Sequence, residues 1–285
     1  MADRAPARLY WIASYPKSGN TWMRAALTSL RRGGGAININ RLDGEQIASS
    51  RAQFDRHAGV EASDLTDAEI QRARPAVFRS LARSQREPLL CKAHEAYVRV
   101  GGEPLFPSDA TLGAVYIVRD PRDVAVSLAH HRQWSLARAV DFLCQPDVDF
   151  SASRGRLNRQ LRQPLGSWSQ HVSSWVSQEG AAGAFSVRVV RYEAMHEDLQ
   201  SILAGLASTL GWGVDDAQLA SAVASSRFER LRGQEAAGGF FERPVAMPAF
   251  FRKGRIGGWR EVLSSAQVEQ IRGCHAEWMA SFGYD

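Results

Sequence analysis

Four short apolar runs mark the chain, near residues 8–14, 88–93, 113–118 and 185–190. Runs of this length are typical of buried strands, and the helical patterns between them are too long to be hairpin turns. We therefore predict an α/β fold in which a central parallel sheet is flanked by helices. Ligands of such sheets bind beyond the carboxyl ends of the strands, so functional residues are expected there.

Helical spacing accounts for two of the histidines. Trp168, Val172 and Trp175 form a stripe typical of a core-facing helix, with His171 as their neighbour. His275 falls on the apolar face of a C-terminal helical pattern. We expect it to pack there and assign it no catalytic role.

Three segments are less regular than the rest, at 33–87, 133–164 and 233–248. Loops on a rigid sheet commonly carry specificity. We therefore assign these segments to the ligand pocket and its lids.

The composition favours a soluble protein. The 285 residues, 45% of them hydrophobic, suffice for a full core. The sequence has no apolar run near the roughly 20 residues that span a membrane, and its first residues lead into no signal-peptide core. Cys91, Cys144 and Cys274 are widely spaced and odd in number. This spacing argues against a disulfide framework or a zinc cluster and favours a reducing cytoplasm.

A net charge of +5 suits an anionic ligand, but it also raises nucleic acid as a partner. Acidic residues are interspersed with the basic ones over most of the chain, unlike in a dedicated nucleic-acid-binding tract. We interpret the densest basic cluster, at 154–162, as a solvated or ligand-gating segment. We therefore expect no nucleic-acid partner.

The stretch YPKSGNTW, residues 15–22, lies between the first apolar run and a helical pattern. It predicts a phosphate-binding loop, because Gly19 lets the backbone approach an anion and the helix start supplies free amides. Compared with the nucleoside-triphosphatase pattern G-x-x-x-x-G-K-[ST], it has Asn20 in the lysine position and carries its lysine at Lys17. No obvious acidic partner nearby completes a magnesium site, so we expect an anion other than a triphosphate.

A second apolar strand, Val115–Val118, runs into RDPRDVAVS at 119–127. Arg119 at the strand end and Ser127 on the following helix could close on one phosphate. The alternative is a capped helix with a surface ion pair, in which Asp120 and Asp123 serve the helix start.

Near the end of the chain, FFRKGRIGGWR at 250–260 places four basic residues among glycines. The glycines let the backbone fold over a ligand, and Arg252 and Lys253 can neutralise phosphate charge. Taken alone, such a loop is usually a solvated connection. Its place after the other two motifs is what indicates binding.

The ordered set of motifs resembles the cytosolic-type sulfotransferases, through YPKSGNTW at 15–22, KAH at 92–94, VRDPRDVAVS at 118–127 and FRKGRIGGW at 251–259. The resemblance covers nearly the whole chain and implies a single P-loop-like nucleotide-binding domain over residues 1–285. It implies transfer of a sulfuryl group from 3'-phosphoadenosine 5'-phosphosulfate (PAPS) to a hydroxyl of a small-molecule, lipid, sugar or peptide-derived acceptor, with adenosine 3',5'-bisphosphate (PAP) as product and no metal. The cofactor-binding residues that it implies are Lys17, Ser18, Gly19, Asn20, Thr21, Trp22, Arg119, Ser127, Tyr192, Arg227, Phe251, Arg252, Lys253 and Gly254.

His94 falls where this family carries its catalytic base. An acceptor hydroxyl is a poor nucleophile at neutral pH, and an imidazole near its working pKa can take the proton as the oxygen attacks sulfur. Lys17 and Lys92 can stabilise the bridging oxygen as negative charge develops on it. Glu95 either orients the imidazole or meets a polar acceptor. His130 and His131 are interpreted as a solvent-facing pair, with one of them facing the acceptor pocket as the alternative.

The sequence also departs from the family pattern. Gly258 stands where many members have aspartate, and Arg227 stands where a serine often helps to hold the 3'-phosphate, although an arginine can still bind phosphate. The family's dimer motif would map to Arg260, Ser264, Ser265 and Glu269. Only the charged positions of the motif are kept. A homo-oligomer therefore stays an open alternative.

Two other classes of function remain. A P-loop kinase would depend on magnesium, and Asn20 in the usual lysine position argues against it. A non-catalytic nucleotide or nucleic-acid binder would tolerate loss of His94 and show strong salt dependence.

Overall fold

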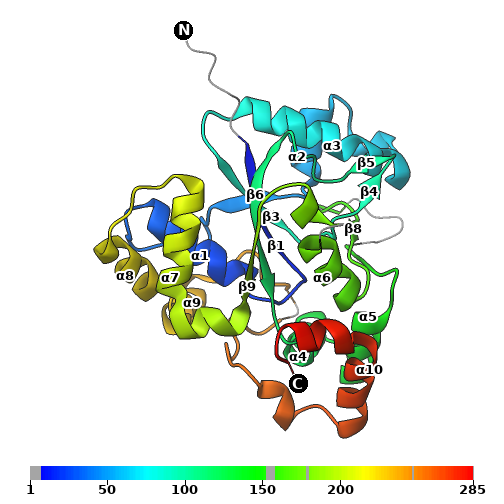
Figure 1. Cartoon of the computed structure of the whole chain (residues 1–285), viewed down its shortest axis with the longest axis vertical. Helices are drawn as coiled ribbons and strands as arrows, with labels where there is room; N and C mark the ends of the chain where they lie inside the picture. The colour runs from blue at the N-terminus through cyan, green and yellow to red at the C-terminus, as the bar shows by residue number, and fades with distance from the viewer. Residues whose placement is uncertain (1–7, 152–157, 178–179, 246, 285) are drawn as a thin grey trace. The chain divides into compact units, whose positions relative to one another are not determined.

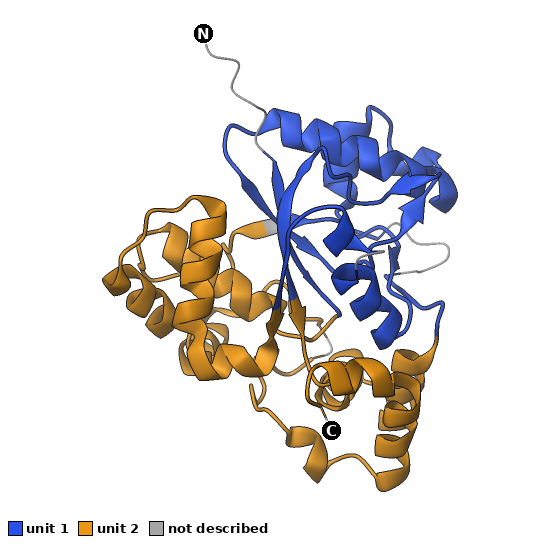
Figure 2. Cartoon of the chain, viewed as in Figure 1, with its two compact units in different colours: residues 1–15, 46–116, 146–189 blue, residues 16–45, 117–145, 190–285 orange. Residues whose placement is uncertain are grey.

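The computed structural model describes residues 8–151, 158–177, 180–245 and 247–284. The chain divides into two compact units, unit 1 with residues 1–15, 46–116 and 146–189, and unit 2 with residues 16–45, 117–145 and 190–285 (Figure 2). That residues 1–285 form one domain stays a prediction. Arg154 and Arg156 of the basic cluster, and the first residues considered for a signal peptide, lie outside the described part.

A five-stranded sheet has the order β2-β3-β1-β6-β9 (Figure 1). Its strands are β1 (Leu9–Ser14), β2 (Gly44–Ile47), β3 (Leu89–Ala93), β6 (Thr111–Val118) and β9 (Val187–Arg191). β1 and β3 pair in parallel, with Leu9 opposite Leu89 and Ala13 opposite Ala93. Every residue of β1 is buried, as the continuous apolar run requires of a central strand. The predicted α/β fold with a central parallel sheet is confirmed, and the four predicted strands are β1, β3, β6 and β9.

The described residues of unit 1 also form three α-helices and two small antiparallel ribbons. The helices are α2 (Arg51–Ala58), α3 (Asp67–Ser84) and α6 (Trp168–Val176), and the ribbons are β4 (Arg99–Val100) with β5 (Glu103–Pro104) and β7 (Asp149–Phe150) with β8 (Gln163–Pro164). Trp11 of β1 meets the rings of Phe78 and Phe106 edge-on at 5.0 and 4.7 Å. This aromatic cluster belongs to the core of unit 1, since each of the three side chains is at most 2% exposed.

Unit 2 is mainly helical. Its helices are α1 (Asn20–Arg31), α4 (Pro121–Arg132), α5 (Leu136–Cys144), α7 (Tyr192–Leu210), α8 (Asp216–Ser225), α9 (Phe228–Gly238) and α10 (Ser265–Ser281). A buried apolar cluster gathers Ile39, Leu231, Phe240 and Phe251 from distant parts of the sequence. Phe240 and Phe251 therefore pack the segment around residues 240–251 into the core of unit 2.

The expectation of irregular structure in the segments 33–87, 133–164 and 233–248 was wrong for much of their length. α2, α3, α5 and the end of α9 lie there. The 18-residue α3 has a capping box, in which the Thr66 side chain accepts from the Glu69 N–H and the Glu69 carboxylate accepts from the Thr66 N–H. Pro75 and the buried Arg74 interrupt its apolar stripe, which is why the helix is hard to see in the sequence.

The expectation that His275 packs on its helix face is confirmed, and His171, the expected neighbour of the core tryptophans, is buried as well. His171 on α6 is 0% exposed and His275 on α10 is 1% exposed. Burial lowers the pKa of each imidazole to about 4, so both are neutral at physiological pH.

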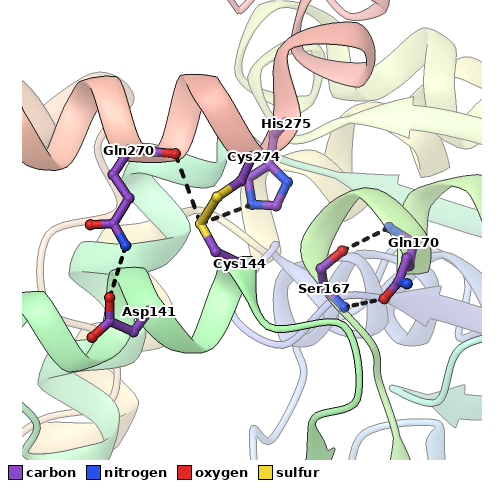
Figure 3. The surroundings of a disulfide bond; sticks show 7 residues. All are labelled: Asp141, Cys144, Ser167, Gln170, Gln270, Cys274 and His275. Carbon is purple, nitrogen blue, oxygen red and sulfur yellow. Dashed lines mark hydrogen bonds between the residues drawn. A yellow bond between two sulfur atoms is a disulfide. The ribbon is translucent and has the colours of Figure 1, made fainter.

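Cys144 and Cys274 form a disulfide, which corrects the expectation that the cysteines stay unpaired (Figure 3). The bond joins the end of α5 to α10, with the two Cα atoms 5.7 Å apart. The Gln270 amide donates to the Asp141 carboxylate at 2.8 Å and ties the same two helices together (Figure 3). The two cysteines are 130 residues apart in sequence, and spacing alone cannot show such a pairing. The cytoplasmic localisation was argued from unpaired cysteines and stays a prediction without that support.

Reduction of this disulfide is expected to lower the free energy of unfolding by about 2–4 kcal/mol, because the bond closes a long loop and restricts the unfolded chain. Urea unfolding with and without dithiothreitol measures the change. The Cys144→Ser/Cys274→Ser variant is the control, since its stability should not respond to the reductant. Equal stability of the oxidised and reduced wild type would contradict the expectation.

Within the described part of the chain, none of the helices combines the length and the apolar character that a membrane crossing requires.

Candidate active site

The loop between β1 and α1 carries two residues with left-handed backbone. Lys17 has φ +75° and Gly19 has φ +103°. These conformations turn the chain sharply, and the amides of the first turn of α1 follow directly. Ser18 between them is fully buried, and its hydroxyl has no hydrogen-bond partner among the described residues. A buried unpaired hydroxyl in a loop of this shape fits an anion better than a plain turn.

Gly19 lies directly against the ring of Tyr192, the first residue of α7. A Cβ at this position would come within 2.6 Å of the Tyr192 Cδ2 atom. Tyr192 also meets the Trp22 ring edge-on, with ring centroids 5.6 Å apart. The loop is thus backed by an aromatic pair, Trp22 and Tyr192, and both are among the predicted cofactor-binding residues.

Substitution of Gly19 by alanine is expected to weaken PAP binding at least about 10-fold and to destabilise the protein by about 1–3 kcal/mol. The new methyl group would strike Tyr192, and φ +103° is strained for any residue with a Cβ. Calorimetric titration with PAP and thermal unfolding measure the two effects.

Gly273→Ala is the matched control. Gly273 lies in α10, and a Cβ there meets no atom within 4 Å. It should leave PAP binding unchanged and slightly raise stability. Equal PAP affinity of Gly19→Ala and wild type would contradict the close packing.

Arg119 follows β6 and connects three features of unit 2. Its guanidinium donates to the carbonyl oxygens of Lys17 at 3.1 Å and Arg255 at 2.9 Å. It also lies over the Tyr192 ring, 4.1 Å from the centroid. The Nε atom is buried and has no hydrogen-bond partner among the described residues. Arg119 therefore links the phosphate loop to the C-terminal glycine-rich segment and keeps donor capacity for an anion.

Asp123 anchors that glycine-rich segment, which we call the strap (residues 250–260). Its carboxylate accepts the N–H groups of Gly257 at 2.7 Å and Trp259 at 3.0 Å. Burial raises the pKa of Asp123, and the neighbouring Arg119 opposes the rise. The alternative in which both aspartates serve the helix start holds for Asp120, whose side chain accepts the Arg122 N–H. Asp123 also lies in the first turn of α4, but its carboxylate binds the strap as well.

Lys17 lies beside an imidazole and an aromatic ring. Its Nζ atom is 3.4 Å from Nδ1 of His131 and 4.2 Å from the centroid of Phe250. The interpretation of His131 as solvent-facing was therefore wrong. The signal was present in the sequence, because His131 lies four residues after Ser127 and so shares its face of α4.

The remaining residues assigned to the cofactor differ in their surroundings. Lys253 is exposed and lies 3.7 Å from Glu261, while the Phe251 side chain packs in the core of unit 2. Arg227 is exposed at the start of α9, and Ser127 is half-buried on α4. Gly254 has φ +58°, and a Cβ there would strike the Phe228 ring. Their roles toward a cofactor stay predictions.

His94 follows β3 in unit 1 and is half-buried. Its Nδ1 atom lies 2.9 Å from the carbonyl oxygen of Ser14 and 3.4 Å from the hydroxyl of the same residue. A carbonyl oxygen only accepts, so we assign the hydrogen to Nδ1. The neutral imidazole then carries its basic lone pair on Nε2.

Glu95 is bonded to the backbone of His94. Its buried carboxylate pairs with Arg74 and accepts the backbone N–H of His94 at 3.1 Å. Lys92 is half-buried on β3, and its carbonyl oxygen accepts the Ala48 N–H at 2.8 Å. Glu95 therefore holds the backbone of His94, which neither alternative from the sequence had described.

The predicted site residues fall into two groups. Lys17, Arg119 and the strap belong to unit 2, and Lys92 and His94 belong to unit 1. Ser14, to which His94 is bonded, lies three residues before Lys17 in the chain.

The proposed dimer residues have local partners. Ser264 caps α10 by accepting the Gln267 N–H, and Glu269 lies 3.6 Å from Arg272 one turn along the same helix. A homo-oligomer stays a prediction.

A strand, a glycine-containing anion loop and a helix, with an arginine at the end of the adjacent strand, define a P-loop-like nucleotide-binding α/β protein. The profile of the sulfotransferase domain matches residues 8–283. The chain therefore belongs to the sulfotransferase family.

Individual relatives are distant. Human sulfotransferase 2B1 is 26% identical over 263 residues, which are 91% of this chain, and the chain spans 62% of the human protein. Cytosolic sulfotransferase 13 of Arabidopsis thaliana is 25% identical over 270 residues, covering 91% of this chain and 73% of that protein.

Solved structures share the fold. Mouse sulfotransferase SULT7A1, solved in complex with PAP, superposes with a TM-score of 0.58 at 20% identity, covering 96% of this chain and 85% of that one. Retinol dehydratase, solved with androsterone and the inactive cofactor PAP, gives a TM-score of 0.59 at 19% identity, covering 94% and 80%.

Proposed function

We propose that the chain transfers a sulfuryl group from PAPS to a hydroxyl of a small-molecule acceptor. The observation that carries the proposal is the loop at Lys17–Gly19, where Lys17 and Gly19 have left-handed backbone and flank the buried, unpaired hydroxyl of Ser18 ahead of a helix. Membership of the sulfotransferase family supports the same reaction, and two structures with the same fold were solved with PAP.

The residues present fit the cofactor. Lys17, Ser18, Gly19, Asn20 and Thr21 would hold the phosphosulfate end, because amides, a hydroxyl and an ammonium are donors suited to such an anion. Arg119, Ser127, Arg227, Arg252, Lys253 and Gly254 would hold the 3'-phosphate. Trp22 and Tyr192 would contact the adenine, with Phe251 supporting the strap from the core. When bound, PAPS supplies the electrophilic sulfur.

The base is proposed to be Nε2 of His94. With the hydrogen on Nδ1 given to the Ser14 carbonyl, Nε2 can take the proton of the acceptor hydroxyl. The ammonium groups of Lys17 and Lys92 would stabilise the negative charge that the reaction produces. These groups act without a metal ion in the proposed mechanism.

The acceptor is proposed to be a small molecule. Retinol dehydratase was solved with retinol and with androsterone, which are molecules of this class. Phe250 and His131 beside Lys17 would offer it an aromatic and a polar contact. Whether a lipid, a sugar or a peptide-derived metabolite is used is decided by screening.

Calorimetric titration with PAP, in buffer containing EDTA and with ATP as competitor, tests the cofactor. Tight binding of PAP over ATP without magnesium is the expected result. Radiolabelled sulfuryl transfer from PAPS to a panel of hydroxyl compounds then tests the reaction. A preference for magnesium-ATP would favour a kinase instead, and PAP binding without any transfer would favour a non-catalytic binder.

A further inference from the structure

His171 is buried beside the proposed base and has no role in the proposed mechanism. Its Nε2 atom lies 2.9 Å from the carbonyl oxygen of His94, and its Nδ1 atom lies 2.8 Å from the hydroxyl of Tyr116. Both ring nitrogens are thus engaged, in a side chain with no exposed surface.

The direction of each hydrogen bond follows from the acceptors. The His94 carbonyl only accepts, so Nε2 of His171 carries the hydrogen. Nδ1 then accepts from the Tyr116 hydroxyl. A neutral ring is required for this pattern, and burial lowers the pKa of His171 to about 4.

Burial strongly raises the pKa of Tyr116, so its hydroxyl keeps the hydrogen that it donates to Nδ1 of His171. His94 is therefore fixed at two points. The Ser14 carbonyl holds its imidazole, and His171 holds its backbone carbonyl.

The other backbone groups at this point are also held. Trp175 of α6 donates from its indole to the Glu95 carbonyl at 3.0 Å. The Glu95 carboxylate takes the His94 N–H, as described above. The N–H, the carbonyl oxygen and the imidazole of His94 are thus each held by a partner, and His171 is the partner of the carbonyl oxygen.

Resting on the proposed function, we propose that His171, with Tyr116, is a positioning residue for the base: it holds the His94 backbone so that the imidazole keeps its bond to the Ser14 carbonyl and presents Nε2 as the basic nitrogen. Neither residue touches the reacting groups in this role. Both act through His94.

The test is long-range ¹⁵N–¹H correlation of the histidine rings, with the His94 signals assigned by their loss in His94→Gln. Wild type is expected to show His94 as a single tautomer with the hydrogen on Nδ1. His171→Leu removes the donor and should give mixed tautomers, while His171→Gln keeps an N–H near the Nε2 position and should preserve the wild-type pattern.

Activity gives a second readout. Relative to wild type, kcat for transfer from PAPS should fall about 10-fold or more in His171→Leu and stay within about 3-fold in His171→Gln, with PAP affinity unchanged in both. If His171→Leu does not fold, Tyr116→Phe replaces it as the test variant, because it removes the hydroxyl that donates to Nδ1 of His171. It should also give mixed His94 tautomers.

His275→Gln is the matched control, because His275 is equally buried and neutral but lies beside the disulfide. The proposal is overturned if the His94 tautomer is unchanged in both His171→Leu and Tyr116→Phe, or if His275→Gln alters it equally. Failure of the sulfuryl-transfer proposal would appear separately, as a wild type that transfers nothing while its His94 ring still responds to these substitutions.

Discussion

His94→Gln is expected to lower kcat for sulfuryl transfer by about 10²- to 10⁴-fold, the usual contribution of a general base. Glutamine approximates the size of the imidazole but cannot accept the acceptor proton. PAP affinity should change less than about 2-fold, because the Nδ1 contact of His94 is to the Ser14 backbone and its proposed partner on Nε2 is the acceptor. Steady-state turnover and calorimetry separate the two effects.

His57→Gln is the control for this substitution. His57 lies on α2 and contacts the Ser80 hydroxyl at 3.2 Å, so it has no part in the proposed chemistry. It should retain wild-type turnover. A comparable loss of PAP affinity and turnover in His94→Gln would show that the residue supports the cofactor site and is not the base.

Arg119→Ala should have the opposite profile and weaken PAP binding about 10- to 100-fold. Charged hydrogen bonds contribute about 1.5–3 kcal/mol each, and here the guanidinium would be lost both as an anion donor and as the link between the loop and the strap. Arg119→Lys should recover only part of the affinity, because an ammonium lacks the planar fork that serves two carbonyls and covers the Tyr192 ring.

Arg272→Ala controls for the change in net charge. Arg272 is exposed on α10 and pairs with Glu269 one turn away, so its loss should leave PAP affinity unchanged. If Arg119→Ala and Arg272→Ala bound PAP equally well, Arg119 would have no direct or organising role in the nucleotide site.

The sheet and the loop could be predicted from the sequence because their signals are local. Buried parallel strands appear as continuous apolar runs. The loop at 15–22 is predicted by a glycine and a lysine that lie between a strand and a helix. α3 was missed because Arg74 is buried by pairing with Glu95, a contact that places a charge on an apolar face. The burial of Arg74 can be explained only once its partner Glu95 is known.

The other differences between the predicted and the observed structure arise from contacts between residues that are far apart in the sequence. In the sequence, Asp123 has the position of a helix-start residue. Its carboxylate, however, accepts the backbone N–H groups of Gly257 and Trp259, which are more than 130 residues away. The disulfide between α5 and α10 is equally remote in sequence. His131 differs from both, since its spacing from Ser127 was sufficient to place it on the same face of α4 as that predicted cofactor residue.

The interleaving of the two units constrains how the protein can be made. The chain passes between units at residues 15, 45, 116, 145 and 189, so neither unit is one continuous stretch. β1 is fully buried, yet its partner β3 is synthesised about 80 residues later. During translation, β1 is therefore synthesised before the strand that it pairs with. Contacts of such long range are slow to form. Neither unit can therefore be obtained by simple truncation of the gene.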